Sequence, residues 1–266
     1  MKFEPVAFSV QGGMDFPLPP MLRVRQHFDR TCVERPEEAA LRALNQLALP
    51  DLRGKRIGIT AGSRRIANLP AVLRAVGAFL RARGASPFLI PAMGSHGGAT
   101  AGGQAELLRS LGITEETTGM SVVSSMETRQ IGTLPNGFPV WCSKTALESD
   151  GVIVCARVKP HTSIRGEVES GLCKMMTVGL GKHTGAAAFH RQGYHRLAEI
   201  LPLAGQVFLD SGKILCGLAL VENAFDETAL IQAVPAAGLV AAEAELLRFA
   251  REQMSRFFLD EIDVLI

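Results

Sequence analysis

The sequence carries almost no excess charge of either sign: 28 lysines and arginines stand against 26 aspartates and glutamates, a net charge of +2 over 266 residues. Proteins that bind DNA or RNA present a basic surface, which this balance does not supply, so nucleic acid is excluded as a partner. No apolar run approaches the roughly 18–20 residues that span a bilayer, which excludes a membrane-embedded protein. The N-terminus includes Lys2 and Glu4 and begins no apolar stretch, so we expect no secretory signal.

Cysteine is scarce and forms no recognisable pattern. The five cysteines are an odd number and contain no CxxC motif, so we expect reduced, partly buried thiols in a cytoplasmic protein. The sequence also lacks internal repeats and low-complexity segments. With 47% apolar and 20% charged residues it has the composition of a folded globular protein, and its length allows one large domain or two small ones. The cysteines are Cys32, Cys142, Cys155, Cys173 and Cys216.

Short apolar runs alternate with amphipathic helical stretches. The runs 56–60, 87–91, 151–156 and 214–221 are typical of strands, and 151–156 is apolar throughout, as expected where both faces of a sheet are covered. Helices are predicted over 69–83 and 100–111, each followed by a glycine, and over 239–250. This alternation predicts an α/β protein, a layered and mostly parallel sheet flanked by helices, Rossmann-like in type.

Three other stretches carry weaker signals. Between 122 and 143 the clearest feature is a turn at 135–137, and 11–20 is predicted to be a loop or a hairpin connection. The apolar stretch 258–266 is predicted to begin a strand. Two interpretations of that end are open: a short edge strand at a natural terminus, or a further C-terminal domain that is missing or truncated after residue 266. We favour the second.

Five of the six histidines lie between 96 and 195, and two of them follow predicted strands directly. His96 comes just after 87–91 and His161 just after 151–156. In open α/β sheets, ligands bind beyond the carboxyl ends of the strands, so these imidazoles are candidates for an acid and a base in one crevice. Arg64, which follows 56–60, is a candidate to bind a carboxylate through two parallel hydrogen bonds. The alternative is that all three are ordinary polar residues of surface loops.

The densest cluster of reactive groups lies in 169–190, where Lys174 stands among glycines and apolar residues. A lysine in such surroundings is a covalent or cationic handle, although a surface lysine with a packed stem is an open alternative. His183 and His190 are two helical turns apart, without the spacing of a zinc motif. The glycine-rich stretch 94–103 matches neither GxxxxGK[ST] nor GxGxxG, so it indicates at most an anion at a helix start.

Taken in order, several short pieces resemble the N-terminal domain of the nickel-dependent lactate racemase family. The resemblance runs over roughly residues 56–190 and is weaker outside them, and it implies that residues 1–266 form one such domain. The resemblance implies a pyridinium-derived nickel-pincer nucleotide as cofactor, tethered to Lys174, with nickel bound by His190 or, as second choice, His183. The matching pieces are AGSR (61–64), AMGSHG (92–97), KPH (159–161), SGLCK (170–174) and His190.

The same resemblance implies roles for the remaining candidates. His96 and His161 would alternate as base and acid on the two sides of the substrate, and Arg64 would bind the carboxylate of a small-molecule substrate. The implied activity is racemisation or epimerisation of a 2-hydroxy acid by reversible hydride transfer to the cofactor. Ala61 stands where the family usually has an aspartate, and 13 residues separate His161 from Lys174. A larger hydroxy acid or a sugar acid is therefore expected as readily as lactate.

Two other classes of function stay open. One is a non-catalytic relative of the same fold that binds an anion or a metal. The other is an unrelated α/β hydrolase or transferase, for which a GxSxG nucleophile motif would speak, and the sequence contains none. The sequence predicts no oligomeric state.

Overall fold

The structure is a computed structural model that describes residues 20, 22–259 and 261–263. The chain divides into two compact units, residues 28–257 and a second unit made of 1–27 with 258–266. The loop predicted over 11–20 lies outside the described residues apart from Pro20. In the second unit the described residues form no helix or strand, so the strand predicted from residue 258 is wrong for the residues described there. No neighbouring strand pairs with them, and the amide of Phe258 donates instead to the side chain of Gln26, at 3.1 Å.

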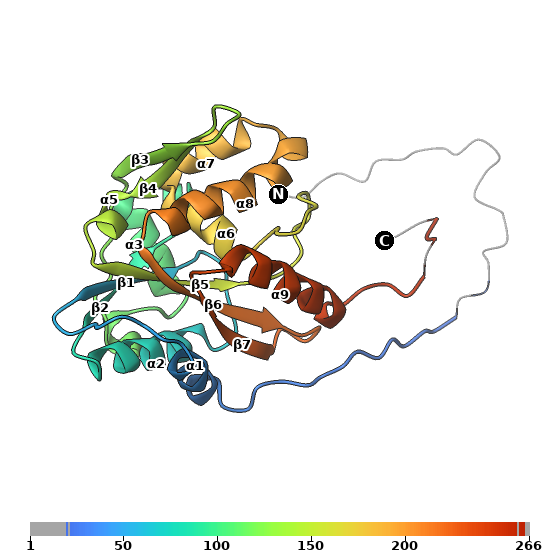
Figure 1. Ribbon diagram of the computed structural model, residues 1–266. Helices are drawn as coiled ribbons and strands as arrows, with labels where there is room; N and C mark the ends of the chain where they lie inside the picture. The colour runs from blue at the N-terminus through green and yellow to red at the C-terminus, as the bar shows by residue number, and fades with distance from the viewer. Residues whose placement is uncertain (1–19, 21, 260, 264–266) are drawn as a thin grey trace, which may run out of the picture. The chain divides into compact units, whose positions relative to one another are not determined.

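Residues 28–257 are built around a five-stranded sheet whose strands are ordered β2-β1-β5-β6-β7 (Figure 1). Four strands are parallel, and β7 pairs antiparallel with β6 at one edge. The four predicted strands are confirmed in one sheet. The strands are β1 (Arg56–Ala61), β2 (Ser86–Pro91), β5 (Gly151–Arg157), β6 (Ile214–Glu222) and β7 (Thr228–Pro235).

Helices cover both faces of this sheet. On β5, Ile153 and Cys155 pack into one core with the first two helices, whereas Val152 and Val154 pack into a second core with the later helices. Burial on both faces explains why this strand is apolar throughout. One face carries α1 (Pro36–Asn45) and α2 (Leu69–Arg81), and the other carries α6 (Leu172–Lys174), α8 (Tyr194–Asp210) and α9 (Leu239–Gln253) (Figure 1).

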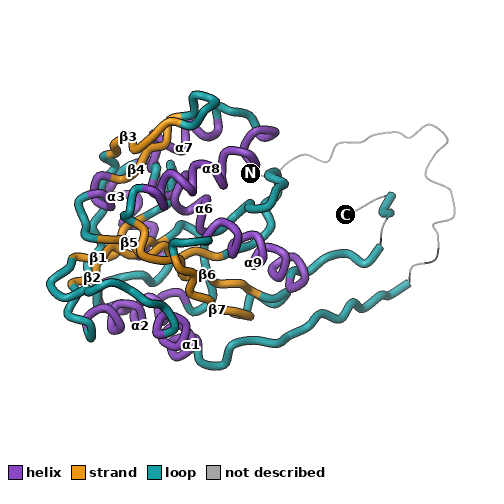
Figure 2. The backbone as a smooth tube through the Cα atoms, in the orientation of Figure 1, coloured by secondary structure: helices purple, strands orange, loops and turns teal. Residues whose placement is uncertain are grey.

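The connection from β2 to β5 contains a smaller sheet. Its antiparallel strands β3 (Thr128–Thr133) and β4 (Pro139–Ser143) form a hairpin, seen beside α7 in Figure 2. The predicted turn is confirmed: Gly137 has a φ of 82°, and the Asn136 side chain accepts from the amide of Phe138 at 3.0 Å. The short elements of this connection are a 3₁₀ turn at Gly97–Ala99, α3 (Ala101–Ser110), α4 (Glu115–Thr118) and α5 (Lys144–Leu147).

A kinked helical run follows β5 and carries much of the predicted chemistry. It consists of α6, a π-helical turn over Met175–Leu180, and α7 (Lys182–His190). Lys182, the first residue of α7, has a φ of 54°, a left-handed conformation that is strained for a residue with a side chain. π-Helical turns occur frequently at functional sites, which draws attention to this run.

The order of the strands places a crevice at the end of β1 and β5. The chain passes from β1 through α2 to β2 on one side, and the next strand of the main sheet, β5, lies on the other side of β1. The connection from β5 to β6 runs through helices on the face of the sheet opposite to α2. Loops that leave neighbouring strands toward opposite faces open a crevice between them, where ligands of such sheets bind.

Two predictions from composition can be compared with the structure. All five cysteines are free thiols; Cys32 is exposed and the other four are buried. Across the described residues, no helix is both long enough and apolar enough to cross a membrane.

Candidate active site

All five predicted site residues line one crevice of about 600 Å³. Its walls come from the loops after β1, β2 and β5, from Ser170 and Gly171, and from the helical run that follows them. The structure therefore brings together positions that lie up to 126 residues apart, whereas His183 is exposed and lies outside this lining. The five are Arg64, His96, His161, Lys174 and His190.

His96 is oriented from both sides of its loop. Its Nδ1 lies 2.5 Å from the hydroxyl of Ser63, on the neighbouring loop after β1. Its carbonyl oxygen accepts from the side-chain amide of Gln104, at 3.3 Å, and the same amide group donates to the carbonyl of Gly94 at 2.9 Å. Gly94 has a φ of 60°, and a Cβ there would lie 3.2 Å from Ala186, so this close approach to α7 requires a glycine.

Lys182 stabilises the same loop through hydrogen bonds to Pro91 and Gln104. Its side chain is fully buried, and its Nζ donates to the carbonyl of Pro91 at the end of β2 and, at 3.1 Å, to Oε1 of Gln104. Burial lowers the pKa of Lys182 to about 8. Hydrogen bonds from Lys182 to Gln104, and from Gln104 to the His96 loop, fix the position of His96 relative to the sheet.

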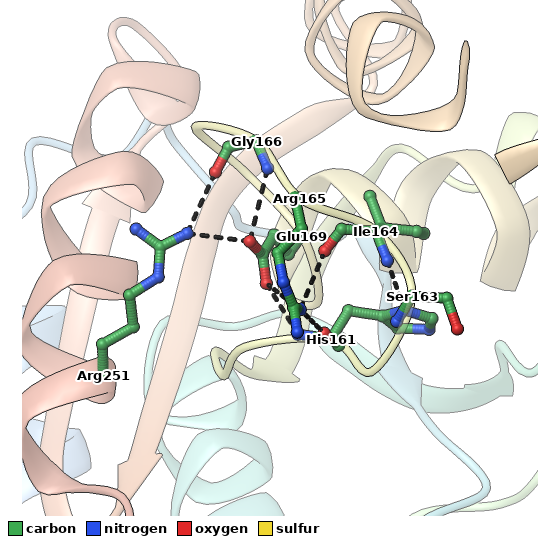
Figure 3. A network of polar contacts seen from close by, with 7 residues as sticks. All are labelled: His161, Ser163, Ile164, Arg165, Gly166, Glu169 and Arg251. Atoms are coloured by element: carbon green, nitrogen blue, oxygen red, sulfur yellow. Dashed lines mark hydrogen bonds and ion pairs between the residues drawn. The ribbon is translucent and has the colours of Figure 1, made fainter. Parts of the chain in front are cut away.

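His161 lies in a turn held by a buried carboxylate (Figure 3). Glu169 is 1% exposed; its Oε2 accepts from the peptide amide of His161 at 2.7 Å, and its Oε1 accepts from Arg251 of α9 at 2.8 Å. The ring of His161 closes the turn, because its Nδ1 accepts from the amides of Ser163 and Ile164, each at 3.1 Å. Neither Glu169, which binds the amide of His161, nor Arg251, which binds Glu169, was predicted from the sequence.

Lys174 lies at the end of α6 in a strongly cationic part of the crevice. Burial, and after it the charges of Arg64 and Lys159, lowers the pKa of Lys174 to about 8. Burial is also the largest cause of the lowered pKa values of the three histidines in the crevice, and Lys174 lowers each of them further. No aspartate or glutamate lies among the described residues of the lining. These charges favour an anionic ligand.

Glu243 of α9 caps the start of α6. Its Oε2 accepts from the amide of Cys173 at 2.7 Å, while its Oε1 has no hydrogen-bond partner in the described part of the chain. Burial raises the pKa of this carboxyl. A Cβ on Gly171 would lie 2.2 Å from Oε1, so glycine is required for the carboxylate to reach the helix start beside Lys174. The signal was present in the sequence: Glu243 falls on the apolar face of its predicted helix.

The donor set suits a cofactor that brings its own metal ligands. Among the residues that the structure describes, no group of three or more His, Cys, Asp or Glu side chains is placed to hold a metal ion. Besides His96, His161 and Lys159, the crevice offers the imidazole of His190, the amine of Lys174, and apolar wall from Met175 and Val178. A planar group with an amine-reactive function and a metal that lacks one ligand fits these residues.

Comparisons with known proteins agree with this architecture. Residues 60–252 match a protein family described as a domain of unknown function, DUF362. A solved structure, the lactate racemase apoprotein from Thermoanaerobacterium thermosaccharolyticum, matches with a TM-score of 0.56 and 15% sequence identity; the match covers 81% of this chain and 56% of that one. This chain therefore spans little more than half the length of that enzyme, and the likeness shows a shared fold. No curated protein matches the chain.

Proposed function

The chain belongs to the family of the domain of unknown function DUF362, and from its crevice we propose a racemase or epimerase that acts on a 2-hydroxy acid by reversible hydride transfer. One observation carries the proposal: Arg64, two histidines, Lys174 and His190 converge on one cationic crevice at the switch point of the sheet. The shared fold with a lactate racemase apoprotein supports the same reaction class.

Different residues of the crevice bind different groups of the substrate. Arg64 binds the carboxylate, since a guanidinium pairs with it through two parallel hydrogen bonds. His96 and His161 face the hydroxyl group and hold or receive its proton. Lowered pKa values leave both rings neutral near pH 7, the form in which an imidazole accepts a proton.

Lys174 and His190 are proposed to hold a nickel-pincer nucleotide, Lys174 as the covalent tether and His190 as the ligand that completes the coordination of nickel. When bound, this group would supply the acceptor for the hydride that leaves the Cα of the substrate. The lowered pKa of Lys174 supports the tether, because a neutral amine is the form that attacks an acyl carbon.

The deciding experiment is intact-mass and nickel analysis of the protein coexpressed with enzymes that make the cofactor. We expect a mass adduct on Lys174, bound nickel, and interconversion of the antipodes of a 2-hydroxy acid. Lys174→Arg keeps the charge but removes the tether, so the adduct should disappear while the fold is kept. An unmodified wild-type protein without nickel, or an adduct that persists in Lys174→Arg, contradicts the proposal.

The second candidate is a binding protein of the same fold that holds an anion without chemistry. The cationic lining favours it, because Arg64, Lys159 and Lys174 form no ion pair in the part of the chain that the structure describes. The same experiment separates the two: a 2-hydroxy acid that binds to nickel-loaded protein and keeps its configuration supports the binding protein.

A further inference from the structure

The two histidines that face the substrate differ in what meets their Nδ1 atoms. Nδ1 of His96 lies 2.5 Å from a hydroxyl oxygen, that of Ser63. Nδ1 of His161 meets two backbone amides, those of Ser163 and Ile164, both at 3.1 Å (Figure 3). A hydroxyl donates or accepts according to need, whereas an amide N–H only donates. The pair therefore differs in which ring nitrogen is able to carry a proton.

At His161 the two amides identify Nδ1 as an unprotonated acceptor. If the ring were flipped, a C–H group would face both amide N–H groups and neither would have an acceptor. If Nδ1 carried a proton, three N–H donors would face one another without an acceptor. The ring proton therefore lies on Nε2. To become an imidazolium, His161 would have to give up both of these hydrogen bonds, because the cation carries a proton on each nitrogen.

The turn that presents these amides is anchored. Glu169 accepts from the peptide amide of His161 and, at 3.3 Å, from that of Gly166, and Arg251 binds the same carboxylate (Figure 3). The charges that act on the ring come from Lys174 on α6 and, within its own loop, from Lys159, Arg165 and Glu169. Three of these four are cations, which disfavour a charged ring, and both oxygens of Glu169 already accept hydrogen bonds.

We propose that His161 stays a neutral Nε2–H hydrogen-bond donor throughout the reaction, and that His96 alone of the two exchanges the substrate's proton. This inference rests on the proposed function for the substrate. In this reaction the hydroxyl O–H bond would break and its proton would pass to Nε2 of His96. A C=O bond would form as the Cα hydrogen left with its electron pair, for which a bound cofactor would supply the acceptor. For inversion the planar keto acid would turn its other face toward the acceptor, the hydride would return to that face, and His96 would give its proton back to the oxygen. His161 meanwhile donates to a substrate oxygen, and Glu169 and Arg251 act as positioning residues for it.

Nitrogen-15 NMR of the cofactor-free protein tests the assignment without any need for activity. Long-range ¹⁵N–¹H spectra of labelled protein, with the ring signals assigned by their loss in His161→Gln, should show Nε2–H and an unprotonated Nδ1 for His161 near pH 7, and a pKa below that of an ordinary imidazole. A proton on Nδ1, or titration of His161 at the ordinary pKa of 6.5, overturns the proposal.

Two variants on α9 test the anchor. Arg251→Gln removes the ion pair with Glu169, whereas Arg248→Gln removes an exposed pair with Glu245 on the same helix and serves as the control. We expect the His161 tautomer to become mixed, and its pKa to move toward the ordinary value, in Arg251→Gln only. An unchanged His161 spectrum in Arg251→Gln contradicts the positioning role.

In the loaded protein, glutamine substitutions separate donation from proton exchange, because glutamine donates a hydrogen bond but does not exchange a proton in this pH range. His161→Gln should keep kcat within about tenfold with an unchanged pH profile, and His96→Gln should lose roughly 10²-fold or more. Equal losses overturn the assignment. If wild-type protein is loaded and inactive while the NMR result holds, the proposed function fails and the tautomer assignment stands.

Discussion

Lys174 and Lys182 lie on one helical run and have pKa values lowered to about 8, with burial as the largest cause in both cases. Their surroundings differ completely. Lys174 lines the crevice beside two other cations and forms no hydrogen bond or ion pair within the described structure. Lys182 is fully buried and donates to the carbonyl of Pro91 and to Gln104.

A shifted pKa therefore does not by itself mark a functional lysine. Active sites and structural clusters both perturb pKa values, and the distinction lies in what the ammonium faces. The amine of Lys174 faces open space in which a ligand fits, whereas the amine of Lys182 is used by the fold. Substitutions at these two positions should accordingly affect different properties of the protein.

The largest expected difference is in stability. Lys182→Ala should lower the free energy of unfolding by ~2–4 kcal/mol, since it opens a cavity and leaves two buried acceptors without a donor. Lys174→Ala should change it by less than ~1 kcal/mol, because that side chain has no partner to lose. Urea unfolding measures both, and Lys182→Met should fall between them because it fills the cavity. Equal destabilisation by the two alanine variants would break the comparison.

Chemical reactivity should show the opposite order. At pH 7 a lysine with a pKa near 8 has far more neutral amine than an ordinary one. A small acylating reagent should therefore modify Lys174 roughly 10- to 100-fold faster than Lys144, whose pKa is raised by its hydrogen bond with Glu127. Lys182 should stay unmodified while the protein is folded, because the reagent has no access to it. Peptide mass spectrometry gives the three rates. Early modification of Lys182 in folded protein would contradict its burial.

The pH dependence of stability sharpens the account of Lys182. Its pKa is about 8 in the folded protein, below the ordinary 10.5 of an unfolded chain, so between these values the unfolded chain binds more protons. Unfolding free energy should therefore gain up to ~1.4 kcal/mol per pH unit from this group as pH rises from 8 toward 10.5. The difference between wild type and Lys182→Met isolates this gain, since other groups titrate alike in both. A difference that does not change with pH would contradict the lowered pKa.

The smallest expected effect is on the pKa values of the crevice histidines, which the charge of Lys174 influences and that of Lys182 does not. Lys174 contributes to the lowered pKa values of His96, His161 and His190, whereas Lys182 contributes to none of them. Lys174→Met should raise these pKa values, and only slightly, because the charges are partly solvated. Lys182→Met should leave those of His161 and His190 unchanged. NMR titration measures the shifts, and a larger response at His161 to Lys182→Met would reverse the assignment.

Much of the sheet and its crevice was predictable from the sequence for local reasons. Strands such as 151–156 are continuous apolar runs, and His96 and His161 follow strand ends that parallel pairing brings to one edge. Their convergence was expected and is observed. Their catalytic roles stay predictions.

What the sequence did not reveal depends on contacts between distant residues. Lys182 lies 91 residues from Pro91 and 78 from Gln104, and nothing near it in the chain indicates burial. Arg251 lies 82 residues from Glu169, so no local pattern joins them. The strand predicted from residue 258 failed for the related reason that apolar character favours a strand, whereas a strand forms only where a partner strand is available.

The π-helical turn has a consequence for the angular phase of the helical run. In a straight α-helix, two residues 16 positions apart, such as Lys174 and His190, would point in directions about 160° apart around the axis. Both nevertheless line the same crevice. The wider turn over Met175–Leu180 and the left-handed residue Lys182 shift the phase between the two ends of the run. If the same residues were wound as a regular α-helix with no residue removed, every side chain of the site would be kept and the amine of Lys174 would point away from the imidazole of His190.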